Sequence, residues 1–225
     1  VSLKKRDGDD ATANIESSGN DNSGSGGGEA QPTVANPVNL SGDSPFSPAA
    51  APRVPNNPKV VFKTSVGDIH VTLNGEKSPI TVDNFIENYV KRGFYNDTIF
   101  HYVQKDAMVV GGGYGVDNQL KEPRAAIQSE ADNGLSNKQG TLAMARAPDY
   151  QHGATSQFFF NLKDNMQFDH QSRESAQTYG YCVFGTVTQG MDVLTKIGGV
   201  ATKDQPEVSP AMPVEPVVIH SIDVL

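Results

Sequence analysis

This chain of 225 residues contains a single cysteine, no tryptophan and no long apolar run. Because Cys182 has no partner cysteine, an internal disulfide bond is excluded, and the fold must rely on burial. A membrane-spanning helix is also excluded, since it would need about 18 consecutive apolar residues. Cysteine, histidine and acidic residues do not cluster at the spacing of a zinc site. The sequence therefore predicts neither a bound metal nor a cofactor.

Basic residues are also few. The chain has 18 lysines and arginines against 26 acidic residues, which gives a net charge of −8. Proteins that bind DNA or RNA need a basic surface to neutralise the phosphates. Nucleic acid is therefore excluded as the main partner.

Residues 1–58 differ in composition from the rest of the chain. They hold seven prolines, seven glycines and one aromatic residue, Phe46, whereas the other sixteen aromatic residues follow Lys59. Such a segment cannot bury enough apolar surface to offset the entropy of ordering it. We predict a low-complexity Gly/Ser/Pro-rich tether at 1–58 and a folded domain at 59–225. A vestigial tail or a cloning remnant is the alternative for the first segment.

The composition of residues 1–58 also bears on the cellular location of the protein. No apolar stretch follows Lys4-Lys5-Arg6, as a secretory signal peptide would require. A long Gly/Ser/Pro segment ahead of a compact domain is nevertheless typical of exported or surface-anchored bacterial proteins. We expect the bacterial periplasm or cell envelope, with the cytoplasm as the alternative.

The apolar pattern of the domain predicts mainly β structure. Ile69, Val71 and Leu73 alternate with polar residues, and residues 60–64 before them complete a hairpin. Many short strands separated by Gly and Asn turns are typical of a closed antiparallel barrel or of a sandwich. The further β-type runs lie at 98–103, 140–145, 157–162, 181–187 and 217–225.

Two helices are predicted as well. Ser78 is placed to cap the first, Pro79 suits its first turn and Gly93 ends it. A weaker helix runs over 191–197. The apolar stripe of the first helix consists of Val82, Phe85, Ile86 and Tyr89.

Six short blocks then occur in one order along the domain. They are Thr98–His101, Met108 with Gly111-Gly112, Glu130–Leu135, Gly140–Arg146, Ala154–Phe159, and Tyr181–Gly185 followed by Gly190–Val193. Over residues 59–225 the combination resembles the cyclophilin family of peptidyl-prolyl cis-trans isomerases, most closely its compact bacterial members. The resemblance implies an eight-stranded antiparallel barrel closed by two helices, with a peptide-binding groove on one side.

The resemblance also implies a reaction. The X-Pro bonds of peptides and unfolded proteins isomerise over tens to hundreds of seconds unaided. A catalyst holds the proline ring in an apolar pocket and stabilises a twisted amide. A hydrogen-bond donor aimed at the amide nitrogen favours that state, because a planar amide nitrogen has no lone pair to accept with. In the family, an arginine directly after the Phe-His pair supplies the donor, assisted by a glutamine on the next strand.

The sequence departs from the family at this donor. Tyr102 stands in place of the arginine, and Val110 stands in place of the glutamine. We therefore expect an isomerase of reduced activity in which the Tyr102 hydroxyl is a weaker, neutral donor. Three further pocket positions differ: Ala107 replaces a phenylalanine, Gln167 a rim aromatic residue, and Tyr181 a histidine.

The retained residues still describe a proline pocket. Phe159 would form its floor, and Gln157 would bond the substrate backbone, which completes a catalytic set with Tyr102. The main chain of Ala145 and Arg146 would pair with the peptide as a strand does. His101 would line the rim as a wall residue, since this reaction transfers no proton. The remaining substrate-binding positions are Phe100, Met108, Val110, Phe168 and Tyr181.

Neighbouring apolar residues have a simpler assignment. Phe158, Phe160 and Met144 are assigned to the core, and Cys182 to a small buried apolar position.

Two functional hypotheses from different classes remain open. The first is a prolyl isomerase, and the second is a non-catalytic module that binds proline peptides or acts as a chaperone. Loss of both the arginine and the glutamine favours the second, whereas Phe159, Met108 and Gln157 favour a site still shaped for proline. A purely structural barrel is the least consistent, because it would not need Gln157 beside an apolar floor.

The predicted barrel and the predicted tether together suggest a hypothesis about the assembly state of the protein. A closed barrel leaves few free strand edges with which the tether could pair. We hypothesise that parts of residues 29–58 pack on a neighbouring copy and give a homo-oligomer through exchanged segments.

Overall fold

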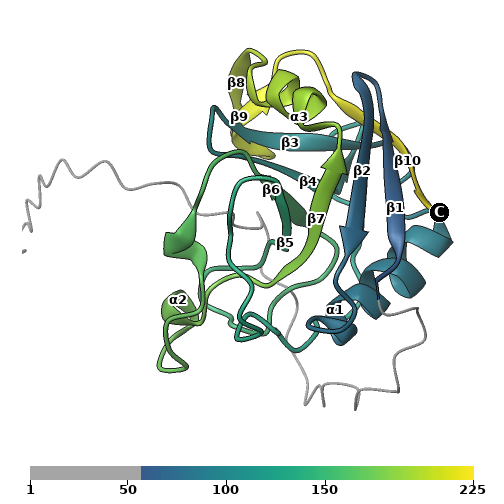
Figure 1. Cartoon of the computed structure of the whole chain (residues 1–225). Coiled ribbons are helices and arrows are strands. Elements are labelled where there is room, and N and C mark those ends of the chain that lie inside the picture. The colour runs from purple at the N-terminus through teal and green to yellow at the C-terminus, as the bar shows by residue number, and fades with distance from the viewer. Residues whose placement is uncertain (1–56) are drawn as a thin grey trace, which may run out of the picture.

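The structure, a computed structural model, describes residues 57–225 and contains a closed eight-stranded antiparallel barrel (Figure 1). Around the barrel the strands follow the order β1-β10-β3-β4-β6-β5-β7-β2. The barrel that the resemblance implied is confirmed, and a sandwich is excluded. The strands are β1 Lys59–Thr64, β2 Gly67–Leu73, β3 Thr98–Gln104, β4 Met108–Gly115, β5 Thr141–Met144, β6 Phe158–Asn161, β7 Val183–Gln189 and β10 Val218–Val224.

The first predicted helix is confirmed but is irregular. It comprises α1 (Pro79–Asp83), a π-helical turn (Asn84–Tyr89) and a 3-10 turn (Val90–Arg92), and it ends at Gly93 with φ 64°. That left-handed conformation is one that glycine adopts without a steric penalty.

Ser78 occupies the N-cap position that the sequence predicted, but its side chain does not cap the helix. Its hydroxyl donates to the Val183 carbonyl over 3.0 Å, and it makes no capping bond. The first free amides of the helix, those of Ile80 and Thr81, donate instead to the Glu130 carboxylate over 3.0 and 2.9 Å. A distant acidic residue therefore satisfies the helix N-terminus, a contact that local sequence cannot reveal.

The helices after the first are short. The second predicted helix is confirmed as α3 (Met191–Gly198). A one-turn helix, α2 (Ala176–Tyr179), and a 3-10 turn (Met166–Phe168) were not predicted. Both lie in the segment that leads from β6 to β7, beside the candidate site described below.

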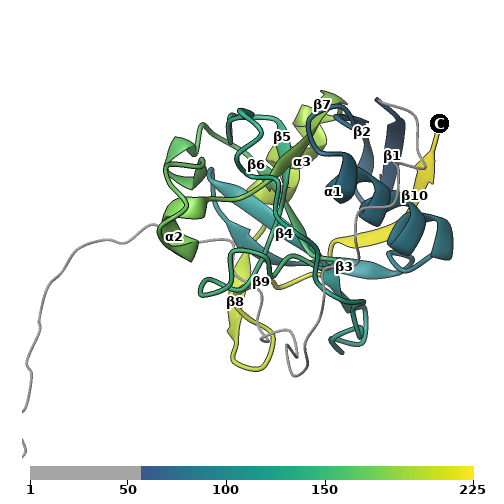
Figure 2. The same ribbon diagram turned by 90° about the horizontal axis from the view of Figure 1, so that it is seen from below.

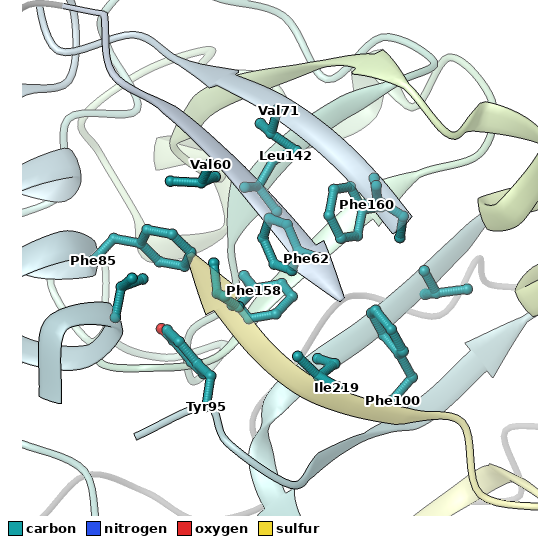
Figure 3. Close-up of a cluster of buried hydrophobic side chains, with 14 of the residues drawn as sticks. Val60, Phe62, Val71, Phe85, Tyr95, Phe100, Leu142, Phe158, Phe160 and Ile219 are labelled. Carbon is teal, nitrogen blue, oxygen red and sulfur yellow. The ribbon is translucent and has the colours of Figure 1, made fainter. Parts of the chain in front are cut away.

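Aromatic side chains fill the barrel interior and reach the first helix (Figure 3). Phe62 contacts Phe158 and Phe160 edge-to-face, with ring centroids 5.4 and 5.2 Å apart. Phe85 extends the cluster to Tyr95. The predicted core positions Phe158, Phe160 and Met144 are confirmed, because all three belong to this cluster.

One strand of the barrel and a small outer hairpin were not predicted. The glycines of β4 hide its β character, because glycine is depleted in strands. The hairpin consists of β8 (Thr202–Gln205) and β9 (Ser209–Pro213), and β9 packs beside β3 (Figure 2). Val208 and Met212 of this region cover Ile99 and Tyr114 on the outside of the barrel.

Within residues 57–225, no helix is long and apolar enough to cross a membrane. The predicted tether at 1–58 lies outside the described residues except for its last two positions. Its predicted character, and the predicted boundary at residue 59, therefore stay predictions.

Candidate functional site

The candidate site is built on one row of side chains that crosses five strands. Tyr102 pairs with Val110, Val110 with Phe159, Phe159 with Ala143, and Ala143 with Val183. Directly paired residues of antiparallel strands point to the same side of a sheet. Since their neighbours along each strand fill the barrel interior, this row faces outward. All five belong to one apolar cluster that is separate from the main core.

A β-bulge in β3 shapes the end of this row. Phe100 pairs with Gly111 and Tyr102 with Val110, so His101 is an extra residue between two pairs. Such a bulge disturbs strict alternation and lets two consecutive side chains share one face. His101 and Tyr102 both lie outside the main core as a result, while Phe100 and Val103 lie inside it.

The assignment of Phe100 to a pocket wall is therefore wrong. Phe100 is fully buried inside the barrel, where its ring lies 6.5 Å from that of Phe158 (Figure 3). A Cβ added at Gly111 would come within 3.0 Å of the Phe100 ring. Gly111 therefore leaves room for Phe100 in the core.

Three aromatic rings form the centre of the outer cluster. The ring centroids of Phe159 and Phe168 are 6.1 Å apart, those of Phe159 and Tyr181 5.8 Å, and those of Phe168 and Tyr181 5.5 Å. All three contacts are close to edge-to-face, the favoured geometry for aromatic pairs. The Tyr181 amide also donates to the Phe168 carbonyl over 2.9 Å, which holds the two rings side by side.

The predicted floor and walls are brought together here. Phe159 is fully buried, and Met108, Val110, Phe168 and Tyr181 are between 1 and 4 % exposed. Their shared cluster is the apolar surface that a proline ring would need, although their roles toward a substrate stay predictions. Gln167, which stands where the family has an aromatic rim residue, is exposed on the turn that carries Phe168.

His101, which we expected to line the rim as a wall residue, is buried. It is 2 % exposed, and its ring lies 4.8 Å from that of Tyr114, under the cover of the β9 region. Burial lowers the pKa of His101 from 6.5 to about 4, so the imidazole is neutral at physiological pH. Its role as a wall of the site stays a prediction.

This buried histidine predicts a dependence of stability on pH. Between pH 4 and 6.5 the unfolded chain binds more protons at His101 than the folded chain does, so stability falls as the pH drops through this window. We expect the free energy of unfolding in urea to be about 2 kcal/mol lower at pH 5 than at pH 7 from this residue alone. His101→Gln should remove that contribution.

Gln157 lies over the glycine-rich strand β4. A Cβ added at Gly113 would come within 2.7 Å of Cδ and Nε2 of Gln157, so the glycine makes room for this side chain. Gln157 is 5 % exposed, and its Oε1 atom has no hydrogen-bond partner among the described residues. An acceptor held in this way suits the predicted contact with a substrate backbone.

Gly113→Ala is expected to impair the site by displacing the Gln157 amide. Loss of one hydrogen bond to the substrate should lower kcat/KM for a proline peptide about 3- to 10-fold. The double variant Gly113→Ala/Gln157→Ala should be no slower than Gln157→Ala alone, because both changes remove the same contact. A multiplicative loss in the double variant would show that Gly113 acts on something other than Gln157.

The main chain of Ala145 is only partly available to a peptide. Its amide already donates to the Gln157 carbonyl over 3.0 Å. Strand-like pairing with a substrate at this position is therefore limited to the carbonyl of Ala145. The sequence alone does not reveal this hydrogen bond, because it joins two segments that are separate in the chain.

The Arg146 side chain is buried and has a structural role. It is 2 % exposed, and its guanidinium donates to the carbonyls of Ala147, Pro148 and Gly180, each over about 3.1 Å. The same group lies 4.6 Å from the centre of the Tyr181 ring. Arg146 thus joins the end of β5 to the segment before β7 and supports one wall of the site.

Tyr102 is half-buried against the outer cluster. Burial raises the pKa of its hydroxyl above the ordinary value of 10, so the group is protonated and can donate at neutral pH. Val110, directly opposite, has no polar atom with which to orient that hydroxyl. The position thus offers one neutral donor beside the apolar cluster.

A buried amide network beneath the site was missed by sequence analysis. Asn165 donates to the Ala107 carbonyl over 3.0 Å and to Asn161 Oδ1 over 2.8 Å, and Asn161 donates to Asn137 over 3.2 Å. Asn137 in turn donates to Asp169 over 3.0 Å. The network fixes the turn before Met108 to the segment that carries Phe168. In the sequence these residues look like ordinary turn asparagines.

Metal and thiol chemistry have no evident role in the described part of the chain. Residues 57–225 contain no group of three or more His, Cys, Asp and Glu side chains placed to hold a metal ion. Cys182 is buried, as predicted, and burial raises the pKa of its thiol to about 12.

Comparisons with known proteins agree with this geometry. Residues 59–224 match the family model described as cyclophilin type peptidyl-prolyl cis-trans isomerase/CLD. The chain belongs to the cyclophilin family. Its activity is that of the family, peptidyl-prolyl cis-trans isomerisation.

Individual relatives place the chain among bacterial cyclophilins. It is 48% identical over 166 residues to peptidyl-prolyl cis-trans isomerase cyp18 of Streptomyces antibioticus, a match that covers 74% of this chain and 98% of the relative. It is 47% identical over 167 residues to peptidyl-prolyl cis-trans isomerase B of Escherichia coli, with 73% and 98% covered.

A solved structure shows the same fold at lower identity. The cyclophilin-type isomerase of Cryptosporidium parvum, crystallised in the presence of the dipeptide Ala-Pro, superposes with a TM-score of 0.60. The two are 22% identical, and the match covers 74% of this chain and 98% of that one.

Proposed function

We propose that this cyclophilin isomerises X-Pro bonds with the Tyr102 hydroxyl as the donor to the amide nitrogen, at a reduced rate. The observation that supports the proposal is the row Tyr102–Val110–Phe159, in which the protonated Tyr102 lies two strands from the buried Phe159 on the same face of the sheet. A neutral donor stabilises the twisted amide less than a guanidinium does. Phe159 with Met108 and Phe168 would receive the proline ring, and Gln157 would accept from the substrate backbone.

The alternative function is a proline-peptide-binding or chaperone module without significant catalysis. It is favoured by the apolar side chain of Val110, which leaves the Tyr102 hydroxyl without a partner to orient it. In this case the cluster around Phe159 would still bind proline peptides.

One experiment separates these two functions. Exchange between the cis and trans forms of an Ala-Pro tetrapeptide is measured by NMR with and without the full chain, and binding is titrated on the same sample. We expect exchange above the uncatalysed rate at catalytic amounts of protein. Binding with no gain in exchange would establish the binding module instead.

The proposed partners and location extend beyond the barrel. The partners are proline-containing peptides and unfolded proteins, and we propose the periplasm or cell envelope of a bacterium as the location. We also propose a homo-oligomer through residues 29–58. Light scattering of the full chain at tens of micromolar should then give more than a monomer mass, and removal of residues 1–58 should give a folded monomer. A monomeric full chain would contradict the exchange of segments.

A further inference from the structure

Some buried polar atoms of this barrel make no hydrogen bond. Four such side-chain atoms are found within residues 57–225: His101 Nδ1, Gln104 Oε1, Asn118 Oδ1 and Gln157 Oε1. Asn118 belongs to a turn after β4. The other three are His101 and Gln104 of β3 and Gln157, which directly precedes β6. Native proteins leave few such atoms unsatisfied, so each is a candidate contact for a ligand.

Gln104 is the member of this group that sequence analysis did not single out. It closes the β3–β4 hairpin, where it pairs directly with Met108. Paired residues share one face of the sheet. Since Met108 belongs to the outer apolar cluster with Phe159, the Gln104 side chain leaves the sheet on the same side.

Gln104 also follows Tyr102 on this face. Tyr102 and Gln104 are two residues apart with Val103 in the core between them, so both project outward from β3. Their spacing along the strand is about 6–7 Å, roughly the distance between alternate side chains of an extended peptide. An extended substrate that runs along β3 with its proline at Tyr102 therefore has the side chain two residues from proline within reach of Gln104.

We propose that Gln104 makes this cyclophilin selective for substrates that carry a hydrogen-bond donor in the side chain two residues from proline. This inference rests on the proposed function, because it assumes that the X-Pro bond binds at Tyr102. The Oε1 atom, which is buried and unpaired in the free protein, accepts from a hydroxyl, amide or ammonium group of that residue. An apolar side chain there would leave the atom unpaired, so only the donor gains transition-state binding.

The side chains paired with this part of β3 offer a substrate no comparable acceptor, so the selectivity depends on Gln104. Met108 opposite it has only a weak thioether acceptor, and Val110 has none. The Gln104 carbonyl is occupied by the Ala107 amide over 3.0 Å, which fixes the turn and leaves the side-chain oxygen as the acceptor. Gln157, which precedes β6, also has an acceptor, but its predicted contact is with the substrate backbone.

The test compares peptides that differ only in one donor. Two pairs of tetrapeptides are used, Thr-Ala-Pro-Ala against Val-Ala-Pro-Ala and Ala-Pro-Ala-Thr against Ala-Pro-Ala-Val, because threonine and valine are nearly isosteric. Exchange is followed by NMR, so that no protease adds its own preference. For the wild-type full chain we expect kcat/KM to be about 3- to 10-fold higher for threonine in at least one pair.

Variants assign the preference to this residue. Gln104→Leu should bring the threonine-to-valine ratio close to 1, whereas Gln104→Glu, which keeps an acceptor, should retain the preference. Gln189→Leu, the same substitution at an exposed position on β7, should keep the wild-type ratio. A ratio that stays high in Gln104→Leu would overturn the assignment.

The outcomes separate this inference from the function on which it rests. Equal catalysis of both members of each pair by the wild type would overturn the selectivity and leave the isomerase proposal intact. No catalysis of any of the four peptides would overturn both.

Discussion

Phe159→Ala should abolish most activity of this cyclophilin, with kcat/KM for a proline peptide reduced about 30- to 150-fold. Phe159 is the fully buried centre of the outer cluster, in contact with both Phe168 and Tyr181. Loss of its ring would remove the surface that buries the proline ring, an apolar contact worth about 2–3 kcal/mol. The loss should appear in peptide binding as well as in turnover, and both are measured by NMR titration and exchange.

Removal of a buried phenylalanine also costs about 3–5 kcal/mol of stability, so a matched control is needed. Phe159→Leu and Phe160→Leu alter adjacent residues of β6 whose side chains face opposite sides of the sheet. Both should lower the urea midpoint by similar amounts. Only Phe159→Leu should lower kcat/KM, and equal losses in the two variants would show that the site is not on the outer face.

Tyr102→Arg should raise kcat/KM about 5- to 30-fold. A charge-assisted hydrogen bond contributes about 1.5–3 kcal/mol against about 0.5–1.5 kcal/mol for a neutral one. If the difference acts only in the twisted state, it lowers the barrier by about 1–2 kcal/mol. The rate gain is measured on the same Ala-Pro tetrapeptide as the wild type.

Val110→Gln supplies the matching test of orientation. Tyr102 and Val110 are directly paired, so a glutamine at 110 would lie beside an arginine at 102. The double variant should therefore exceed the product of the two single effects. An unchanged rate in both Tyr102→Arg and the double variant would mean that position 102 is not aimed at the reacting bond.

The sequence predicted the barrel better than it predicted the details of the site. Hairpin β1–β2, the Pro79 helix and the aromatic core follow from periodicity and helix signals that are local in sequence. The outer cluster of Phe159, Phe168 and Tyr181 required the resemblance, because their contacts join residues far apart in the chain.

The errors have identifiable physical causes. Phe100 cannot be placed by strict alternation from Tyr102, because the bulge at His101 changes the side on which residues of β3 emerge. The capping role of Ser78 is taken by Glu130, some fifty residues away in sequence. Gln104 could have been found, since a three-residue turn over 105–107 places it opposite Met108.

The most direct test of the account is the comparison of the wild type with Tyr102→Phe. This substitution removes one hydroxyl and keeps the ring that packs on the outer cluster. Wild-type catalysis of the Ala-Pro tetrapeptide should be measurable, and Tyr102→Phe should lower kcat about 2- to 10-fold with peptide affinity unchanged. An equal kcat in the two proteins would contradict the assignment of the Tyr102 hydroxyl as the donor.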